Sequence, residues 1–528
     1  MSDTVDPVAL AVYQNAMTSI AEEMGAALRR SSVSPNIKER RDYSCAIFDD
    51  EGRVIAMGDH MPVHLGSMPM SVASAIESQT LNRGDIVILN DPYAGGTHLP
   101  DITMVMPVFA LTASKATFYV ATRAHHSDVG GMFAGSMGPG REIFQEGIRI
   151  PPIHIVRSGI VEADILRLIL LNVRTPVERE GDLAAQMGAC RIGEQRLLQL
   201  CERFAPTYLR YLSDRLLDYS ERLVRAELRS LPAGDYVAED FLDDDGVSAD
   251  PIKIAVTLRI DPIAETLEID FSGTSNQVRG SVNAVRAITV SACLYVLRCL
   301  MPDGSPTNEG TLRRLTLITP PGSVVDAESP AAVAGGNVET SQRIVDTILR
   351  ALAQAAPLRI PAASAGTMSN LTIGGIDLRT RLPFTYYETI AGGMGAGPHR
   401  DGTPGIHTHM TNSLNTPIEA LEYAYPLRAK RYSYRAGSGG IGVHRGGNGL
   451  IREFELLTDS QVTLLCDRQK VAPYGLGGGN AGAPGRVMVQ APCEVASSPL
   501  AGKSSQYLPT GTALRIETPG GGGWGSTV

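Results

Sequence analysis

Histidines and aspartates that could bind a metal ion are concentrated between residues 42 and 128. Five of the ten histidines lie between His60 and His126, and aspartates alternate with them. Imidazole and carboxylate together are the ligand set of a divalent ion such as Zn²⁺, Mn²⁺ or Fe²⁺, and these residue types leave the identity of the metal open. We therefore expect one mononuclear site. The ligands we predict for it are Asp42, His98, Asp101 and His125.

A predicted hairpin explains how Asp101 and His125 meet. The segments 101–109 (DITMVMPVF) and 117–125 (TFYVATRAH) are strand-like and flank a polar turn centred near Ala113. Both residues lie equally far from that centre, so in a regular hairpin they face each other on neighbouring strands and share one face of the sheet. His98 is one short turn ahead of Asp101. We expect the three side chains to converge.

A second predicted hairpin, residues 41–60 (RDYSCAIFDDEGRVIAMGDH), contributes Asp42. Its two apolar runs flank a turn near Asp50 and Glu51. Counting outwards from this turn sets Asp42 across from the pair Asp59 and His60, at the open end of the hairpin.

Residues 124–131 (AHHSDVGG) place a second histidine next to His125. Successive side chains alternate along a strand, so His126 should point away from His125. It would then bind substrate or support a ligand from behind. If the strand has already ended, His126 could be the ligand and His125 the supporting residue. A metal site would also need room for a water whose pKa the ion lowers. The candidate catalytic residues are Asp42, His125 and His126. The structural alternative is a loop histidine capped by a carboxylate, which the spacing HxxD also fits.

Three other motifs are weaker candidates. Residues 437–442 (GSGGIG) match GxGxxG, but a loop and a strand follow where a dinucleotide-binding fold requires a helix. Residues 501–505 (AGKSS) end like a phosphate-binding loop, yet Ser497 stands where its first glycine belongs, so we expect a surface loop. Residues 407–422 (HTHMTNSLNTPIEALE) place His407 and His409 either on one strand face or in a hydrogen-bonded loop ahead of a helix capped near Thr416.

The composition excludes several classes of protein. A formal net charge of −9 without a long Lys/Arg run argues against binding to nucleic acid. The seven cysteines are scattered and form no CxxC pair, which predicts reduced thiols in a cytoplasmic protein. The N-terminus lacks the pattern of a signal peptide, and the most apolar helical run, 288–301, is too short to span a bilayer. We expect no membrane association.

The order of elements predicts a mixed α+β fold with antiparallel hairpins, mixed sheets, long helices and glycine-rich loops, in two to three intimately packed lobes. Helices are predicted at 6–30, where Asp6 is the N-cap and Pro7 follows it, and at 162–174, 180–228 (a long section, antiparallel or kinked), 283–300 and 339–357. Soft boundaries separate an N-terminal metal-binding lobe (1–231), a central α/β lobe (232–358) and a glycine-rich, strand-rich lobe (359–528). The glycine-rich loops should bury little by themselves and close over a partner.

Eight segments carry a resemblance to a known family. They are ERRDYSCAIFD, GDIVILNDPYAGGTHLPDITMVMPVF, ATRAHHSDVGG, NVRTPVEREGDLAAQMGA, PAAVAGGNVETSQRIVD, HTHMTNSLNTPIEALE, HRGGNGLIREFE and TPGGGGWG. Together they resemble the hydantoinase B/oxoprolinase family, from the first helix to the C-terminus. This family comprises the B-type subunits of N-methylhydantoinases, 5-oxoprolinases, caprolactamases and acetone or acetophenone carboxylases.

The resemblance implies a function and a partner. An A-type subunit of the actin-like ATPase fold would bind ATP and phosphorylate a small cyclic amide, and the two chains would associate as a heterotetramer or larger complex with a contact between the B-type chains. The resemblance also places a metal site on His98, Asp101 and His125, where the activated ring would be opened. Two alternatives stay open: a carboxylase subunit of the same architecture, although the B-type chains of carboxylases look longer, and a noncatalytic scaffold for the ATPase.

Overall fold

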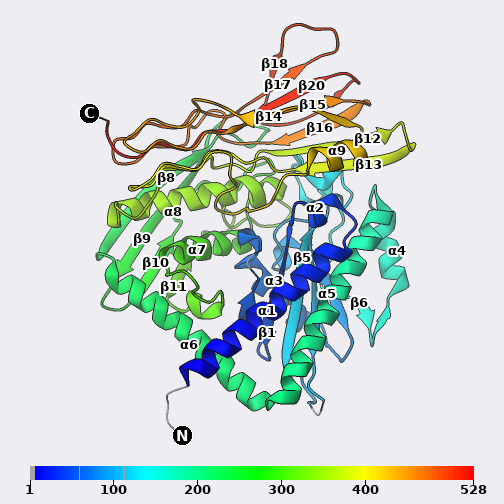
Figure 1. Ribbon diagram of the computed structural model, residues 1–528, viewed down its shortest axis with the longest axis vertical. Helices are drawn as coiled ribbons and strands as arrows, with labels where there is room; N and C mark the ends of the chain where they lie inside the picture. Colours follow the sequence, from blue (N-terminus) through cyan, green and yellow to red (C-terminus); the bar gives the residue numbers. More distant parts are fainter. Residues whose placement is uncertain (1–5, 59, 112, 528) are drawn as a thin grey trace.

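The structure, a computed structural model, describes residues 6–58, 60–111 and 113–527, and it confirms the mixed α+β fold. Within these residues the named strands form one sheet of seven strands, two of four and one of five. Figure 1 shows the sheets of the last third of the chain lying as a layer across the helices and sheets of the first two thirds. The predicted metal ligands belong to the seven-stranded sheet or to segments directly beside it.

The seven-stranded sheet is antiparallel and has the order β2-β1-β5-β4-β3-β6-β7. Its strands are β1 (Tyr43–Asp49), β2 (Val54–Met57), β3 (Ile86–Leu89), β4 (Asp101–Val108), β5 (Phe118–His125), β6 (Ile153–Arg157) and β7 (Ile160–Val161). Helices α1 (Pro7–Ser31) and α5 (Pro176–Arg203) pack on one face of this sheet, and α3 (Ser67–Ser78) packs on the other. The central strands are therefore buried on both faces, which explains why most of their residues are apolar.

Helix α1 begins where its sequence predicts. The side chain of Asp6 accepts a hydrogen bond from Val8 N, Pro7 occupies the first helical position, and Arg29 and Arg30 stand in the last turn. An acidic cap and basic last turn both complement the helix macrodipole.

The predicted helical section over 180–228 consists of two helices. Helix α5 ends at Arg203, and α6 (Pro206–Ser230) begins at a proline, which cannot donate the hydrogen bond that a continuous helix would need. The shorter α4 (Ala163–Leu171) precedes them. In Figure 1, α5 runs alongside α1.

The central part of the chain forms a four-stranded sheet with two helices beside it. The strand order is β11-β10-β9-β8, and the elements are β8 (Gly234–Leu242), β9 (Ile252–Asp261), β10 (Thr266–Asp270), α7 (Arg286–Leu300), β11 (Leu315–Ile318) and α8 (Ser341–Ala355). A π-helical turn, Gly336–Thr340, leads into α8. The predicted boundaries fall between α6 and β8 and just after α8. One apolar core nevertheless runs from α1 through α8, so the first two predicted lobes pack as one body.

The last third of the chain holds two antiparallel sheets over a separate apolar core. One has the order β13-β12-β16-β19 and the other β14-β15-β20-β17-β18. Their elements are β12 (Asn370–Asp377), β13 (Leu382–Glu388), α9 (Ile418–Ala424), β14 (Leu427–Tyr434), β15 (Leu450–Leu456), β16 (Ser460–Leu465), β17 (Arg486–Gln490), β18 (Ser498–Leu500), β19 (Lys503–Leu508) and β20 (Ala513–Glu517). The prediction for residues 501–505 was wrong, because Lys503 begins β19 and its buried ammonium lies 2.8 Å from Asp467.

The glycine-rich segments of the last third pack against one another, which corrects the expectation that they bury little on their own. Gly440 N donates to Gly521 O, Gly521 N to Gly447 O, and Gly447 N to Met394 O. Residues 519–523 are buried. A Cβ atom on Gly521 would lie 2.0 Å from Met394 O, so the close approach of these backbones requires glycine.

All seven cysteines are free thiols, and four of them are buried: Cys45, Cys190, Cys293 and Cys466. Among the residues that the structure describes, none of the helices has the length and apolar character needed to cross a bilayer.

Candidate metal centre

The β4–β5 hairpin places Asp101 directly opposite His125, as its spacing predicts. The two strands pair from Asp101↔His125 at one end to Val108↔Phe118 at the other. Both side chains project from the same face of the sheet. His125 Nδ1 lies 3.3 Å from Asp101 Oδ1, and both side chains are buried. The hairpin register is confirmed.

His98 reaches the same point from the turn that leads into β4. The backbone N–H of Asp101 donates to His98 O, which folds the turn back on itself. His98 Nε2 then lies 3.2 Å from Asp101 Oδ1 and 3.2 Å from His125 Nδ1. We call His98, Asp101 and His125 the ligand trio. Their three atoms form a nearly equilateral triangle in the interior of the protein.

The geometry of the ligand trio fits a divalent metal ion. Metal–ligand bonds of about 2.0–2.2 Å place neighbouring ligand atoms roughly 3–3.5 Å apart, which is the spacing seen here. Asp101 Oδ1 is buried and has no hydrogen-bond partner among the described residues. A buried carboxylate oxygen without a partner is costly, and a cation bound by the three residues would satisfy it.

The electrostatics also suit metal binding, which needs an ionised carboxylate and neutral imidazoles. Burial alone would raise the pKa of Asp101, but the imidazoles of His98, His125 and His64 around it hold that pKa well below its usual range. Burial lowers the pKa of His125, and it does the same for His64. The aspartate is therefore charged and these two imidazoles are neutral at neutral pH.

The second oxygen of Asp101 is held by two residues that the sequence analysis did not assign. Thr97 Oγ1 donates to Asp101 Oδ2 at 2.5 Å, and His64 Nε2 lies 3.4 Å from the same oxygen. His64 is fixed in turn by Ser44 Oγ, 2.8 Å from its Nδ1. His64 was counted among the clustered histidines, but it stands in a 3₁₀ turn (Pro62–His64) that no strand register could place.

The last third of the chain closes the other side of the trio. Tyr387 on β13 stacks on the His125 ring with centroids 4.5 Å apart and an interplanar angle of 14°. Its hydroxyl donates to Asn370 Oδ1, and Asn370 Nδ2 donates to Glu339 Oε1 in the π-helical turn. The centre is thus enclosed by all three predicted lobes. No sequence signal pointed to Tyr387, because its contact with His125 joins residues far apart in the chain.

Asp42 lies beside His125 through a strand pairing that was not predicted. β1 pairs with β5 as well as with β2, and His125 N donates to Asp42 O at 3.0 Å. The side chain is buried, and burial raises its pKa while the neighbouring His125 and Arg40 oppose that shift. Asp42 is not one of the three residues whose ligand atoms lie within 4.8 Å of one another. Asp59, its expected neighbour, lies outside the described residues.

His126 points away from the trio, as the alternation along β5 predicts. Its Nε2 lies 2.9 Å from Gln186 Oε1 on α5, and its backbone N–H donates to Pro100 O. Burial, reinforced by the charge of Arg179, lowers the pKa of His126 to about 4, so the ring is neutral. It packs behind the strand that carries His125.

The remaining histidine and aspartate candidates have other partners. Asp128 pairs with Arg174 at 2.9 Å and accepts the N–H of Gly135. His407 and His409 lie in a loop ahead of α9, not on a strand, so the loop alternative for residues 407–422 is correct. Both line a cavity of about 490 Å³, and His409 Nε2 lies 3.3 Å from Asp346.

Comparison with known proteins assigns the chain to a family. The family model described as hydantoinase B/oxoprolinase matches residues 6–527. The chain belongs to the hydantoinase B/oxoprolinase family.

Two relatives show the range of this family. 5-Oxoprolinase 1 of Arabidopsis thaliana is 37% identical over 555 residues, which cover 100% of this chain and 42% of the plant protein. A putative B-type subunit of a D-/L-hydantoinase from Pseudomonas sp. (strain NS671) is 30% identical over 552 residues, covering 99% of this chain and 90% of the relative. The chain thus spans about two fifths of the plant enzyme and most of the bacterial relative.

Two solved structures share the fold. ATP-dependent caprolactamase from Pseudomonas jessenii superposes with a TM-score of 0.91 at 28% identity, covering 99% of this chain and 92% of the other. Acetone carboxylase in a nucleotide-free state gives a TM-score of 0.90 at 17% identity and covers 98% and 76%. At that lower identity the likeness concerns the fold alone.

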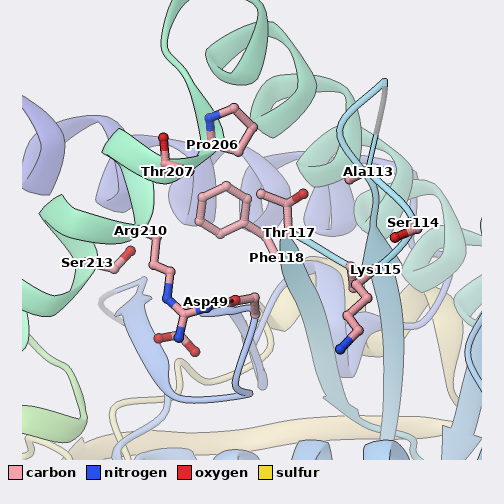
Figure 2. A pocket seen from close by; sticks show the side chains of 12 residues that line it. Asp49, Ala113, Ser114, Lys115, Thr117, Phe118, Pro206, Thr207, Arg210 and Ser213 are labelled. Carbon is pink, nitrogen blue, oxygen red and sulfur yellow. Dashed lines mark hydrogen bonds and ion pairs between the residues drawn. The ribbon is translucent and has the colours of Figure 1, made fainter.

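A surface cavity of about 370 Å³ lies at the opposite end of the hairpins from the ligand trio. It is bounded by the turns after β1 and β4 and by the start of α6, and Figure 2 shows Arg210 reaching from α6 toward Asp49. Arg210 is paired with Asp50 and with Glu51. Seven strand residues at about 3.3 Å each separate this end of β4 from Asp101, roughly 23 Å away. The cavity therefore has no part in the chemistry of the trio.

Proposed function

We propose that this chain is the B-type subunit of an ATP-dependent cyclic amide hydrolase, and that it opens a ring amide which an A-type partner has activated by phosphorylation. The observation that carries the proposal is the convergence of His98 Nε2, Asp101 Oδ1 and His125 Nδ1 in the protein interior. The names of the relatives, a 5-oxoprolinase and a hydantoinase of the B type, and of the caprolactamase neighbour support the substrate class.

The trio would hold a divalent ion, Zn²⁺, Mn²⁺ or Fe²⁺, with Asp42 as a further ligand. When bound, such an ion supplies polarisation of a carbonyl oxygen and a lowered pKa for water. Burial of the trio keeps bulk water from the activated amide. Thr97 and His64 hold the Asp101 carboxylate in one orientation, and Tyr387 holds the His125 ring in its plane.

Asp42 and His126 complete the proposed set of catalytic residues in different ways. A carboxylate has two oxygens, so Asp42 would offer one to the ion and the other to the proton released when water attacks the ring carbonyl. His126 acts as a positioning residue. Through Gln186, which also donates to Ile102 O on β4, it fixes the end of the hairpin that carries the trio.

ATP chemistry is assigned to the partner because the described part of this chain offers no convincing phosphate loop. Residues 437–442 are followed by loop and then by β15, not by a helix, and the ammonium of Lys503 is committed to Asp467. Ring amides resist hydrolysis because attack disrupts amide resonance, and phosphorylation on the partner would supply a leaving group. The designation of the Pseudomonas relative as one subunit of a hydantoinase supports a two-chain arrangement.

The first alternative is that the chain is a subunit of a carboxylase. The fold is shared with acetone carboxylase, but this chain covers only 76% of that chain against 92% of the caprolactamase. The higher sequence identity with the caprolactamase, 28% against 17%, favours the hydrolase. A noncatalytic scaffold is the second alternative, and the intact, buried trio argues against it, since a buried Asp101 Oδ1 between two histidines, without a hydrogen-bond partner among the described residues, has no structural purpose.

The deciding experiment is co-expression with the A-type neighbour, followed by metal analysis and turnover assays with a panel of lactams, hydantoins and ketones. We expect about one divalent ion per chain and ATP-dependent opening of a lactam or hydantoin. Carboxylation of a ketone without ring opening would assign the chain to the carboxylase class. A fully active complex that contains no metal after purification without chelator would refute the metal centre.

A further inference from the structure

Asn337 is a buried amide that the sequence analysis did not assign, and it faces the ligand trio from the central part of the chain. It stands in the π-helical turn Gly336–Thr340 that leads into α8. Its side-chain Nδ2 lies 3.1 Å from His98 Nε2, the same atom that converges with Asp101 and His125. Its Oδ1 is buried and has no hydrogen-bond partner among the described residues.

The contact between Asn337 and His98 is incompatible with a metal-bound His98 if the amide nitrogen faces the ring. The neutral imidazole has one lone pair on Nε2, and that pair cannot accept an N–H and bind a cation at once. A carboxamide can turn by half a rotation, which exchanges its nitrogen and its oxygen at nearly the same position. The turned amide would present Oδ1 to the centre of the trio and would leave no unpaired oxygen.

The position of the terminal amide atom fits a ligand whichever way the amide is turned. The terminal atom of Asn337 lies 3.1 Å from His98 Nε2, close to the 3.2 Å and 3.3 Å that separate the atoms of the trio. Neighbouring ligands of one ion are separated by roughly 3–3.5 Å, so an amide oxygen at this point stands where a further ligand would stand.

The backbone around Asn337 is fixed from several directions. A Cβ atom on Gly336 would lie 1.9 Å from Asn283 O, so the turn presses against the preceding loop in a way that only glycine permits. Glu146 Oε1 accepts the N–H groups of Val333 and Ala334 just ahead of the turn. Ser341 Oγ donates to Asn337 O at 2.6 Å. A π-helical turn held this firmly is typical of functional sites.

We propose that Asn337 is a further ligand of the metal held by the trio, bound through its side-chain oxygen. The inference rests on the proposed metal centre, and it extends that centre from the N-terminal part of the chain to the start of α8. A neutral amide oxygen is an acceptable donor for the hard and borderline divalent ions that carboxylate and imidazole also bind.

The test compares Asn337→Leu, which keeps the size of the side chain and removes its oxygen, with Asn337→Asp, which keeps an oxygen in place. Affinity for Zn²⁺ and for Mn²⁺ is measured by chelator competition, and the absorption spectrum of the Co²⁺-loaded protein reports the ligand set. We expect Asn337→Leu to weaken metal binding by about 10- to 100-fold, because even residues that only support the ligands affect affinity on this scale. It should also change the absorption spectrum of the Co²⁺-loaded protein. Asn337→Asp should retain the metal, because a carboxylate oxygen can take the same position.

Gln342→Leu is the matched control. Gln342 is a buried amide on α8 with an unpaired Oε1, but its Nε2 donates to Thr408 O, away from the trio. The control should lose comparable thermal stability and keep its metal affinity. The proposal is overturned if Asn337→Leu binds the metal as tightly as the control does with an unchanged Co²⁺ spectrum, or if the unaltered chain binds no divalent ion. A chain that binds the metal through Asn337 but opens no ring in complex with its partner would refute the proposed function and leave this inference standing.

Discussion

At the scale of single residues, Asp101 and His125 are paired across the β4–β5 hairpin and are both candidate metal ligands, so the strand register that forms the hairpin also forms the site. The carboxylate is buried, yet three histidines and Thr97 keep it ionised and oriented. A mutation here should therefore act on metal binding first and on stability second. His125 and His126 provide a matched comparison because they are adjacent, both buried, and on opposite faces of β5.

His125→Ala should abolish ring opening by orders of magnitude and release the metal, while phosphorylation by the partner continues, so ATP turnover becomes uncoupled. His126→Ala should retain the metal, because its ring contacts Gln186 and not the trio. That variant loses a buried hydrogen bond and should be destabilised by about 1–3 kcal/mol. Metal content, ATP turnover and ring opening are measured on the same preparations. Full metal occupancy and ring opening in the His125 variant would mean that the site is built from other residues.

Glu146 gives a prediction of pH dependence. Burial raises its pKa from 4.5 to about 8, although the N–H groups of Ala334 and Val333 oppose the shift. The folded chain then binds this proton more tightly than the unfolded chain, so the group's contribution to the free energy of unfolding falls as pH rises from about 4.5 to about 8. Glu146→Gln should remove this slope. Melting temperatures of both proteins at pH 5.5 and pH 8.5 check this prediction. The melting temperature of the variant, relative to that of the unaltered chain, should be higher at pH 8.5 than at pH 5.5. An equal difference at the two pH values would contradict the assignment.

The sequence predicted contacts between residues that are close along the chain, and it did not predict contacts between distant segments. The Asp101–His125 pairing follows from counting along one hairpin, and His98 follows from its distance to Asp101. His64, Tyr387 and Asn337 reach the same point from segments whose placement depends on the packing of whole lobes. No local periodicity encodes such contacts. The position of Asp42 was predicted from the wrong neighbour, because β1 pairs on its other side with β5.

At the scale of elements, helices were predictable where caps and prolines mark their ends. Asp6 and Pro7 begin α1, and Pro206 separates α5 from α6. The glycine-rich segments were harder to interpret. Loops and closely packed backbones both require glycine, and the choice between them depends on what lies opposite each residue in space.

Two glycine substitutions should have opposite effects for this reason. Gly521→Ala would place a Cβ atom 2.0 Å from Met394 O in a contact between backbones that cannot move apart, and should cost about 3 kcal/mol or more. Gly188 lies within α5, where a Cβ atom would meet nothing within 4 Å. Gly188→Ala should therefore stabilise the protein by about 0.5–1 kcal/mol. Denaturant unfolding of both variants checks the pair, and equal effects would show that the packing of the glycine segments is not what the structure implies.

At the scale of the whole molecule, the proposed reaction is divided between two chains. The candidate centre is enclosed by all three predicted lobes, while the described residues offer no convincing place for ATP. The expectation that the glycine-rich loops need a partner to cover them does not hold, because those loops cover one another. The proposal of a partner rests instead on this division of chemistry and on the subunit designation of the hydantoinase relative.

The purified single chain should bind a divalent ion, hydrolyse no ATP and open no ring, because the trio can hold a metal without any means of activating an amide. Adding the A-type subunit should restore both activities together and shift the mass to a heterotetramer or larger complex with a contact between the B-type chains. Light scattering and coupled assays on the separate and mixed chains test this, and the His125→Ala chain serves as the control for assembly without ring opening. Robust ATP consumption by the rigorously purified single chain would mean that this chain itself contains the nucleotide site. A monomeric mass in the presence of excess partner would refute the proposed assembly.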